Sequence, residues 1–335
     1  MSSELITVVI PTRDRPDFLE LTLSSVVERQ ETIPKIIVSD NSTRDLPEIE
    51  VLRRKYGFSY VRQSGKLSMF DHHNACLRLP STPWAILLHD DDELSPNIVR
   101  KLESLAKSSD AGAIVGGIEY IDENSARKGS WLPDREGNFK GEEIVLHLGL
   151  DYRVCPPGIL WNVAACRELG GFPLAHGNPN ERALLLRLAL SYGVVLVPQM
   201  MGRYRVWANQ TTNMSTPERA EYIVDMTIQG AQSMREIGMS RSTEDQLLDY
   251  EIWWIFRYAT PLFSKHPFFV SRLCRKCEIA TPPNGVWRAR VRSEYPFLFW
   301  KPRRLATLFV VMAMTFVPRP IRRALNRATG LVVTK

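Results

Sequence analysis

The chain has 335 residues, 44% hydrophobic and 24% charged, which corresponds to about two domains or one elaborated domain. This composition excludes a largely disordered or collagen-like chain, and five cysteines, an odd number, favour a reducing compartment over a disulfide framework. The net charge of +6 is unevenly distributed, because residues 261–335 carry a net charge of +13 and residues 1–260 a net charge of −7. A mildly acidic body with a basic tail predicts that the tail contacts something anionic.

Strand-like and helix-like segments alternate along the first 200 residues. Residues 5–10 are continuously apolar, as in a strand buried on both faces, and Pro11 ends this run. Further strands are predicted at residues 35–39, 58–61, 84–88, 113–118 and 194–197, and helices at residues 97–107, 142–148 and 180–192. Asp17, Ser95 and Asn180 are placed to cap the helices that follow them. The alternation predicts an α/β fold, with a parallel sheet covered by helices on both faces.

The character of the sequence changes after about residue 215. Residues 129–157 are predicted to be mostly loops, whereas residues 217–237 and 243–258 are predicted to be helical. We therefore divide the chain into an α/β domain, residues 1–215, and a helical, basic and aromatic C-terminal region, residues 216–335. The N-terminal residues lack the pattern of a secretory signal, and no apolar run approaches the roughly 18 residues of a membrane-spanning helix.

Three polar clusters directly follow predicted strands, at residues 12–14, 40–42 and 90–92. In an open parallel sheet, ligands bind beyond the carboxyl ends of the strands. The third cluster is three consecutive aspartates, which repel one another unless they share a cation, and such oxygen ligands favour Mg²⁺ or Mn²⁺. The alternative is a solvated acidic loop that complements the next helix dipole. The position of the three aspartates beside the other two clusters favours the metal interpretation.

These motifs are PTRDR (residues 11–15), IIVSDNST (residues 36–43) and DDDELSP (residues 90–96). In this order they resemble the family 2 glycosyltransferases with the GT-A fold, over about residues 5–215. The resemblance implies a Rossmann-like, mostly parallel sheet flanked by helices, with a C-terminal helical extension here. It also implies that the first two strand ends hold a nucleotide and that the aspartates hold a divalent cation, Mg²⁺ or Mn²⁺. By position, the implied base and ribose contacts are Pro11, Thr12, Arg13 and Asp40; Asp90 would bind the donor, with Asp91 or Asp92 as the direct metal ligand.

The resemblance extends to a catalytic base. Asn180-Glu181 stands where the family has an acidic pair six residues before an arginine, here Arg187, and GGFP (residues 170–173) matches the family's lead-in. Glu181 is therefore the implied base, with a glutamate where aspartate is usual. The alternative is that Glu181 is an ordinary acid in the first turn of a helix. In either role, its place at the helix N-terminus should keep the carboxylate ionised.

Other positions depart from the family pattern or extend it. His89 stands where the aspartate motif often begins, and we interpret it as a packed or hydrogen-bonding residue. In YRVW (residues 204–207), Trp207 replaces a histidine, while Arg203 and Arg205 would contact the diphosphate. Residues 64–74 resemble a loop near the donor, so Asn74 is implied to lie beside it, and Lys66 is equally well a phosphate contact or a surface lysine.

Two pairs of metal-ligand type have simpler interpretations. His72 and His73 are adjacent, and neighbours on a helix face different directions, so they do not predict a bidentate site. Cys274 and Cys277 have no second cysteine pair, which favours ordinary thiols over zinc or redox chemistry.

The basic tail, residues 261–335, also contains ten aromatic residues. Aromatic and basic residues together favour an anionic membrane surface, since thirteen apolar residues at 305–317 are too few to span a bilayer of about 30 Å. Packing on the domain or homo-oligomerisation is the alternative. Nucleic acid is disfavoured because no nucleic-acid-binding module accompanies the charge.

Taken together, the sequence predicts an inverting, metal-assisted hexosyl- or deoxyhexosyltransferase. Its donor would be a nucleotide sugar, and its acceptor a saccharide or a lipid-linked sugar in cell-surface polysaccharide assembly. We expect it in the cytoplasm, peripheral on the inner face of the cell membrane. A nucleotidyltransferase is an alternative, but residues 11–17 lack the glycines of a phosphate loop. The second alternative is a catalytically silent sugar-nucleotide-binding or scaffold protein, which the departures at Asn180 and Trp207 leave open.

Overall fold

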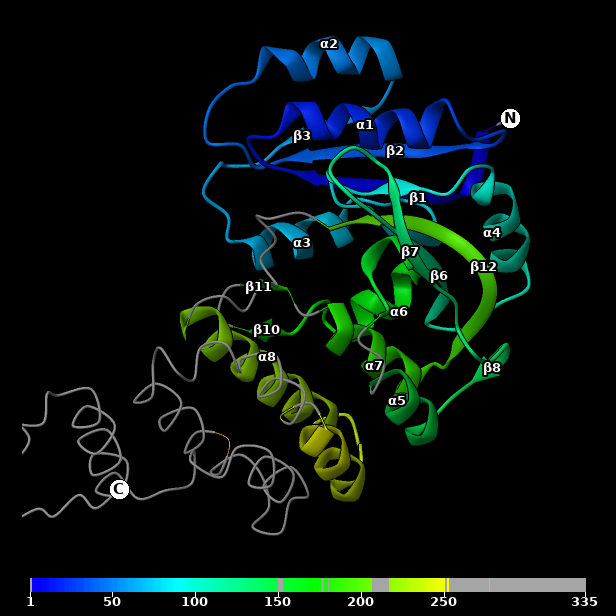
Figure 1. Ribbon diagram of the computed structural model, residues 1–335, viewed down its shortest axis with the longest axis vertical. Coiled ribbons are helices and arrows are strands. Elements are labelled where there is room, and N and C mark those ends of the chain that lie inside the picture. Colours follow the sequence, from blue (N-terminus) through cyan, green and yellow to red (C-terminus); the bar gives the residue numbers. More distant parts are fainter. Residues whose placement is uncertain are drawn as a thin grey trace, which may run out of the picture.

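The computed structural model describes residues 2–149, 153–175, 178–179, 181–206, 217–250, 252 and 277. These residues form a ten-stranded mixed sheet with helices on both faces (Figure 1). Its strands are β1 (Ser2–Thr12), β2 (Ile33–Asp40), β3 (Ser59–Arg62), β4 (Trp84–Leu87), β5 (Glu93–Leu94), β6 (Ala113–Ile121), β7 (Arg127–Trp131), β8 (Gly137–Phe139), β9 (Ile159–Asn162) and β12 (Val194–Arg205). The helices are α1 (Pro16–Val27), α2 (Pro47–Tyr56), α3 (Met69–Arg78), α4 (Ile98–Lys107), α5 (Glu142–Gly149), α6 (Val163–Glu168), α7 (Glu181–Ser191) and α8 (Pro217–Arg235). A short 3₁₀ turn, Pro156–Gly158, precedes β9, and β10 (Leu174–Ala175) pairs with β11 (Asn178–Pro179) in a separate hairpin.

The sheet has the order β3-β2-β1-β4-β9-β6-β12-β5, with β7 on β6 and β8 on β12. The predicted parallel pairing holds for β3, β2, β1 and β4 and for β6 with β12. Strand β9 runs antiparallel between β4 and β6, and neither it nor β7 and β8 was predicted. These short strands follow turns and proline-containing segments, where the apolar periodicity is too brief to distinguish a strand from a loop.

The strand register determines where the polar clusters lie. Thr12 pairs with Asp40, and Asp40 pairs with Arg62, so β1, β2 and β3 end at the same level of the sheet. Val9 pairs with Leu87, which brings the segment after β4 beside the end of β1. The carboxyl ends of the parallel strands therefore lie along one edge.

Two apolar cores cover the two faces of the sheet. One contains α1, α2 and α4, whose side chains pack on Ile10, Val38 and Ile86. The other contains α3 and α5–α7, packed around Trp161, Phe172 and Leu184. Helix α7 is apolar around most of its circumference, and six of its eleven residues are buried, as expected for a helix enclosed in the core.

Two predicted helix caps are wrong. Helix α1 begins at Pro16 with Arg15 at the N-cap, so Asp17 lies inside the first turn. Helix α4 begins after Asn97, whose backbone has φ 56°, because the backbone of Ser95 is still bonded to Met201 and Gln30. Proline at the first helical position replaces a side-chain cap in α1, since it has no N–H that needs a partner.

The described part of the C-terminal region is helical, as predicted, in α8 and in residues 241–250. Ala220, Val224 and Leu247 join the core that contains α7, and Leu247 packs directly over Gly149, where a Cβ would lie 2.3 Å from it. Within the described residues, no helix is both long and apolar enough to cross a bilayer. The basic tail, except for buried Cys277, lies outside the described residues.

Candidate functional site

The three polar clusters predicted from the sequence lie together. The Thr12 hydroxyl donates to Asp90 Oδ2 at 2.7 Å, which joins the end of β1 to the aspartate loop. The backbone N–H of Asn41 donates to the Thr12 carbonyl at 3.0 Å, and the Asp14 N–H donates to Ser42 Oγ at 2.8 Å. The ends of β1, β2 and β4 are thus connected by direct hydrogen bonds. Pro11 lies buried in β1, and Arg13 is exposed beside Asp14.

The carboxylate of Asp40 is fully buried at this edge. It accepts hydrogen bonds from Tyr60 Oη at 2.7 Å, Arg62 Nη1 at 2.5 Å and the Ser42 N–H at 2.8 Å. Burial alone would raise its pKa, but these donors lower the pKa below the ordinary value and keep Asp40 ionised. Tyr60 and Arg62 were not identified from the sequence, since only the parallel register of β3 on β2 brings them to Asp40.

The loop between β3 and α3 lies against the end of β2. The side-chain amide of Asn41 bonds to both the carbonyl and the N–H of Leu67, at 2.9 and 3.3 Å. Gly65 has φ +74° and approaches so closely that a Cβ would lie 2.8 Å from the Ser42 carbonyl oxygen. This contact places the exposed Lys66 next to the nucleotide-binding edge implied by the sequence.

Asn74 has a different role from the expected donor contact. Its Oδ1 accepts from the Phe172 N–H at 2.9 Å, and its Nδ2 donates to the Phe172 carbonyl at 3.2 Å. Both ends of the amide therefore hold the segment before α7 against α3. Gly171 is required at this contact, since a Cβ there would lie 2.3 Å from Asn74 Oδ1.

The three aspartates occupy different environments. Asp90 is buried and pairs with Arg15 at 2.5 Å, and Arg15 also reaches Asp91 at 3.2 Å. Burial and the charge of Asp91, opposed by Arg15, raise the pKa of Asp90 to about 6. Of the two aspartates that pair with Arg15, Asp91 is the more accessible, with its side chain 16% exposed. Arg15 follows the Thr-Arg-Asp cluster by one residue, and the sequence did not indicate its contact with the aspartates.

Asp92 fits a divalent cation. Its Oδ1 accepts from the Arg205 N–H at 2.9 Å, but its Oδ2 is buried without a hydrogen-bond partner among the described residues. Burial and the neighbouring charge of Asp91 raise its pKa well above the ordinary value. A buried carboxylate oxygen normally has a partner, and a cation shared with Asp91 would supply one. His89, Asp91 and Asp92 also form a group whose ligand atoms lie within 4.8 Å of one another.

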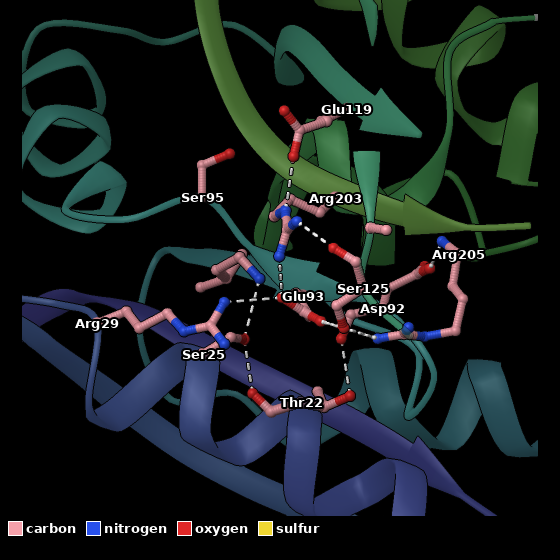
Figure 2. A network of polar contacts seen from close by, with 12 residues as sticks. Thr22, Ser25, Arg29, Asp92, Glu93, Ser95, Glu119, Ser125, Arg203 and Arg205 are labelled. Carbon is pink, nitrogen blue, oxygen red and sulfur yellow. Dashed lines mark hydrogen bonds and ion pairs between the residues drawn. The ribbon is translucent and has the colours of Figure 1, made fainter. Parts of the chain in front are cut away.

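A buried ionic network holds this loop in place (Figure 2). Glu93 is buried and accepts from Arg29, Arg203 and Arg205, at 2.8, 2.5 and 2.8 Å. The Arg205 Nε also donates to the Asp91 carbonyl at 2.8 Å, and the Thr22 hydroxyl bonds to the carbonyls of the aspartate loop. The loop backbone is thus bonded from α1 on one side and β12 on the other.

Arg205 therefore differs from the expectation that it contacts a diphosphate. Its side chain is 0% exposed, and its guanidinium bonds to Glu93, Ser125 and three backbone carbonyls. The sequence did not indicate these contacts, because it does not show which face of β12 carries Arg205. Trp207 and Asn180, the other departures noted near this region, lie outside the described residues.

Glu181, the first residue of α7, lies beside two histidines. Its Oε1 is 3.6 Å from His89 Nε2 and 3.8 Å from His73 Nε2, and the two Nε2 atoms are 3.1 Å apart. Burial lowers the pKa of His73 to about 4, whereas Glu181, with Asp92 and Asp91, overcomes the burial of His89 and raises its pKa to about 9. Burial would raise the pKa of Glu181, but His89 and His73 lower it. Glu181 is ionised as expected, but the two histidines contribute more to this than its position at the start of a helix.

The adjacent histidines face different partners, as predicted. His72 Nε2 lies 3.0 Å from both the hydroxyl and the carbonyl oxygen of Ser39, under the end of β2. His73 points to His89 and Glu181 instead. His89 is hydrogen-bonded, yet it also lies in both groups of side chains with metal-ligand spacing.

Residues 7–159 match the family model for glycosyl transferase family 2. The α/β domain is therefore similar to the family 2 glycosyltransferases over residues 7–159, and its fold is of the GT-A type. No curated protein gives a significant match to this chain. The family match favours glycosyl transfer over the alternative of a nucleotidyltransferase.

Several solved structures share the fold of this chain. S. aureus TarS 1–349 in complex with UDP-GlcNAc is 14% identical, with a TM-score of 0.62 over 83% of this chain and 82% of that chain. The same protein in complex with UDP is 13% identical, with a TM-score of 0.59 over 88% and 90% of the two chains. The mannosyltransferase PcManGT from Pyrobaculum calidifontis, in complex with GDP-Man and Mn²⁺, is 12% identical, with a TM-score of 0.50 over 98% and 88%.

Proposed function

We propose that this chain is an inverting glycosyltransferase that uses a nucleotide-sugar donor and Mg²⁺ or Mn²⁺. It transfers a hexosyl or deoxyhexosyl group to a saccharide or a lipid-linked acceptor. The observation that carries the proposal is the buried Oδ2 of Asp92, which has no hydrogen-bond partner in the described part of the chain and lies beside Asp91 at the edge where three strand ends meet. TarS with UDP-GlcNAc and PcManGT with GDP-Man and Mn²⁺ share the fold, which supports this class of donor and cation.

In this proposal the nucleotide lies along the ends of β1 and β2. Pro11, Thr12 and Arg13 contact it from the end of β1, and Asp40 contacts it from the end of β2. Ionised Asp40 suits a ribose or base donor, because a carboxylate accepts strong hydrogen bonds from hydroxyl and N–H groups. Exposed Lys66, in the loop between β3 and α3, would contact a phosphate.

Asp91 and Asp92 would hold the cation, and Asp90 would bind the donor. When bound, the cation neutralises charge on the departing diphosphate. Arg15 keeps Asp90 and Asp91 oriented through its two ion pairs. Arg205 was expected to contact the diphosphate. It instead positions the two aspartates, because it donates to the Asp91 carbonyl and to Asp92 Oδ1.

Glu181 would be the general base. Its carboxylate takes the proton of the acceptor hydroxyl while the acceptor oxygen bonds to the anomeric carbon and the bond to the diphosphate breaks. Attack from the face opposite the leaving group inverts the anomeric centre. Its lowered pKa favours the ionised form that accepts a proton, and its side chain is 22% exposed.

The setting we propose is the cytoplasmic side of the cell membrane, in the assembly of surface polysaccharide. The support is the net charge of +13 and the ten aromatic residues in residues 261–335. Such a segment binds anionic lipid peripherally and would keep the enzyme near an acceptor carried on lipid. Packing of this segment in a homo-oligomer is the competing arrangement.

The decisive experiment measures donor binding by calorimetry, with UDP-GlcNAc and GDP-mannose as first probes, with and without Mn²⁺. Replacing both Asp91 and Asp92 by Asn should abolish the Mn²⁺-dependent part of the affinity while the circular dichroism spectrum is retained. Asp17→Asn, an exposed acid in the first turn of α1, is the matched control. Unchanged donor affinity in the double variant would refute the metal assignment.

A catalytically silent sugar-nucleotide-binding protein makes a different prediction. It would bind the donor with Mn²⁺ yet release no sugar or nucleoside diphosphate over long incubation. Measuring hydrolysis of the bound donor with and without Mn²⁺ therefore separates that alternative from the enzyme.

A further inference from the structure

A second group of ligand-type atoms lies beside the aspartate loop. It consists of His73 Nε2 from α3, His89 Nε2 from the end of β4 and Glu181 Oε1 from α7. Two helices and the segment after β4 thus bring one nitrogen or oxygen each to within 3.8 Å of one another. Asp91 and Asp92 belong to a different group, which shares only His89 with this one.

The spacing of the three atoms matches a coordination centre. Their separations are 3.1 Å between the two nitrogens and 3.6 and 3.8 Å from the nitrogens to the oxygen. The point equidistant from all three lies about 2.0 Å from each, which is the length of Zn–N and Zn–O bonds in proteins. An ion could therefore bind with little movement of these side chains.

His73 is held in the form that binds a metal. Its Nδ1 lies 2.8 Å from the Met69 carbonyl oxygen, so Nδ1 carries the proton and the lone pair of Nε2 points into the group. A backbone carbonyl on the second ring nitrogen is the usual partner of a metal-bound histidine. The His73 side chain is 6% exposed and packs edge-on to the Phe172 ring, with 6.0 Å between ring centroids. These contacts fix the ring before any ion binds.

The remaining ligands leave an opening. The side chains of His89 and Glu181 are 25% and 22% exposed, so an ion can enter from solvent and keep water as a further ligand. Two imidazoles and one carboxylate favour Zn²⁺ and related transition metals, whereas Mg²⁺ favours an all-oxygen shell. The chemistry of this group therefore differs from that of Asp91 and Asp92.

We propose that His73, His89 and Glu181 form a second cation site, selective for Zn²⁺-type ions over Mg²⁺. An ion at this site holds Glu181 Oε1 as a ligand and leaves that oxygen unable to accept a proton. Zn²⁺ is then an inhibitor of transfer, a consequence that rests on the proposed role of Glu181 as base. The binding itself does not depend on that role.

The test is a titration of the full-length protein with Zn²⁺ by calorimetry and with Co²⁺ by visible absorption. Excess Mg²⁺ is present to occupy the aspartates, and the buffer is mildly alkaline because a ligating imidazole is unprotonated. We expect one ion per chain, with a Co²⁺ spectrum of nitrogen and oxygen ligands. His73→Gln and Glu181→Gln should each weaken binding by more than the roughly 10- to 100-fold loss that follows removal of an outer-shell partner.

His72→Gln is the matched control, because His72 is the neighbouring buried histidine and contacts Ser39 instead of the site. It should bind Zn²⁺ as the wild type does. Circular dichroism without metal checks that each variant folds, and Glu181→Gln changes a partly exposed side chain if His73→Gln does not fold. Wild-type affinity in a folded His73→Gln or Glu181→Gln variant, or thiolate bands in the Co²⁺ spectrum, would overturn the proposal.

Discussion

Replacing Glu93 by glutamine should cost the domain considerable stability with little change in shape. Glu93→Gln keeps the size of the side chain but removes the negative charge that Arg29, Arg203 and Arg205 share. The new amide also directs an N–H₂ group at a guanidinium. The arginine that suffers is Arg205, since its side chain is 0% exposed and water cannot replace Glu93.

The magnitude follows from these exposures. Arg29 is 40% exposed and Arg203 keeps Glu119 at 2.8 Å, so both retain compensation. Removing one partner of a buried pair costs about 3–5 kcal/mol, a large share of a total stability of roughly 5–15 kcal/mol. At roughly 2–4 °C per kcal/mol for a domain of this size, Tm should fall by about 6–20 °C.

Thermal unfolding followed by circular dichroism measures this loss. Glu50→Gln is the control, because Glu50 pairs with Arg53 and Arg54 at the surface of α2 and is 53% exposed. An exposed pair contributes about 0–1 kcal/mol, so this variant should unfold near the wild-type temperature. Equal Tm values for the two variants would refute the argument that the buried network supports the aspartate loop.

The same network predicts a pH dependence. Burial would raise the pKa of Glu93, but the Ser125 hydroxyl and the three arginines lower it below the ordinary value. A carboxyl group with a lowered native pKa contributes stability above its unfolded pKa, about 4.3, and this stability is lost as pH falls through the native pKa. The stability difference between wild type and Glu93→Gln should therefore be full at pH 7 and shrink below about pH 4.

Three further predictions concern the base, the donor loop and the tail. Glu181→Gln should lower kcat by roughly 100-fold or more with little change in donor affinity, and near-normal transfer by this variant would place the base elsewhere. Gly65→Ala should destabilise the protein by more than about 1–2 kcal/mol, measured by urea unfolding, because alanine disfavours φ +74° and its Cβ would also meet the Ser42 carbonyl. Gly57→Ala, with similar φ and open space, should show the conformational cost alone. Charge reversal in the tail should release the protein from anionic vesicles in co-sedimentation, while equal wild-type binding to anionic and neutral vesicles would favour packing of the tail on protein. The residues to reverse are Arg319, Arg322 and Arg323.

The sequence alone was sufficient for the parallel half of the sheet. Strands β1, β2 and β4 each contain a run of apolar residues, which are mostly β-branched in β1 and β2, and burial on both faces requires such runs. Each is followed by a polar cluster, and parallel strands place their carboxyl ends along one edge, so the meeting of Thr12 with Asp90 could be anticipated. Strand β9 could not, because its four residues, which pair antiparallel with β4 and β6, are too few to show a distinctive period.

Tertiary structure alone decided which polar side chains face the site. Arg205 and Asn74 were expected at the donor, but the pairing of β12 with β5 and β6 turns Arg205 onto Glu93, and the packing of α3 turns Asn74 onto Phe172. His73, His89 and Glu181 are up to 108 residues apart in the chain and meet only because α3, β4 and α7 pack together. Local sequence determines which segments become strands and helices through the spacing of apolar residues. Contacts between distant side chains depend on register and helix rotation, which only the packed core determines.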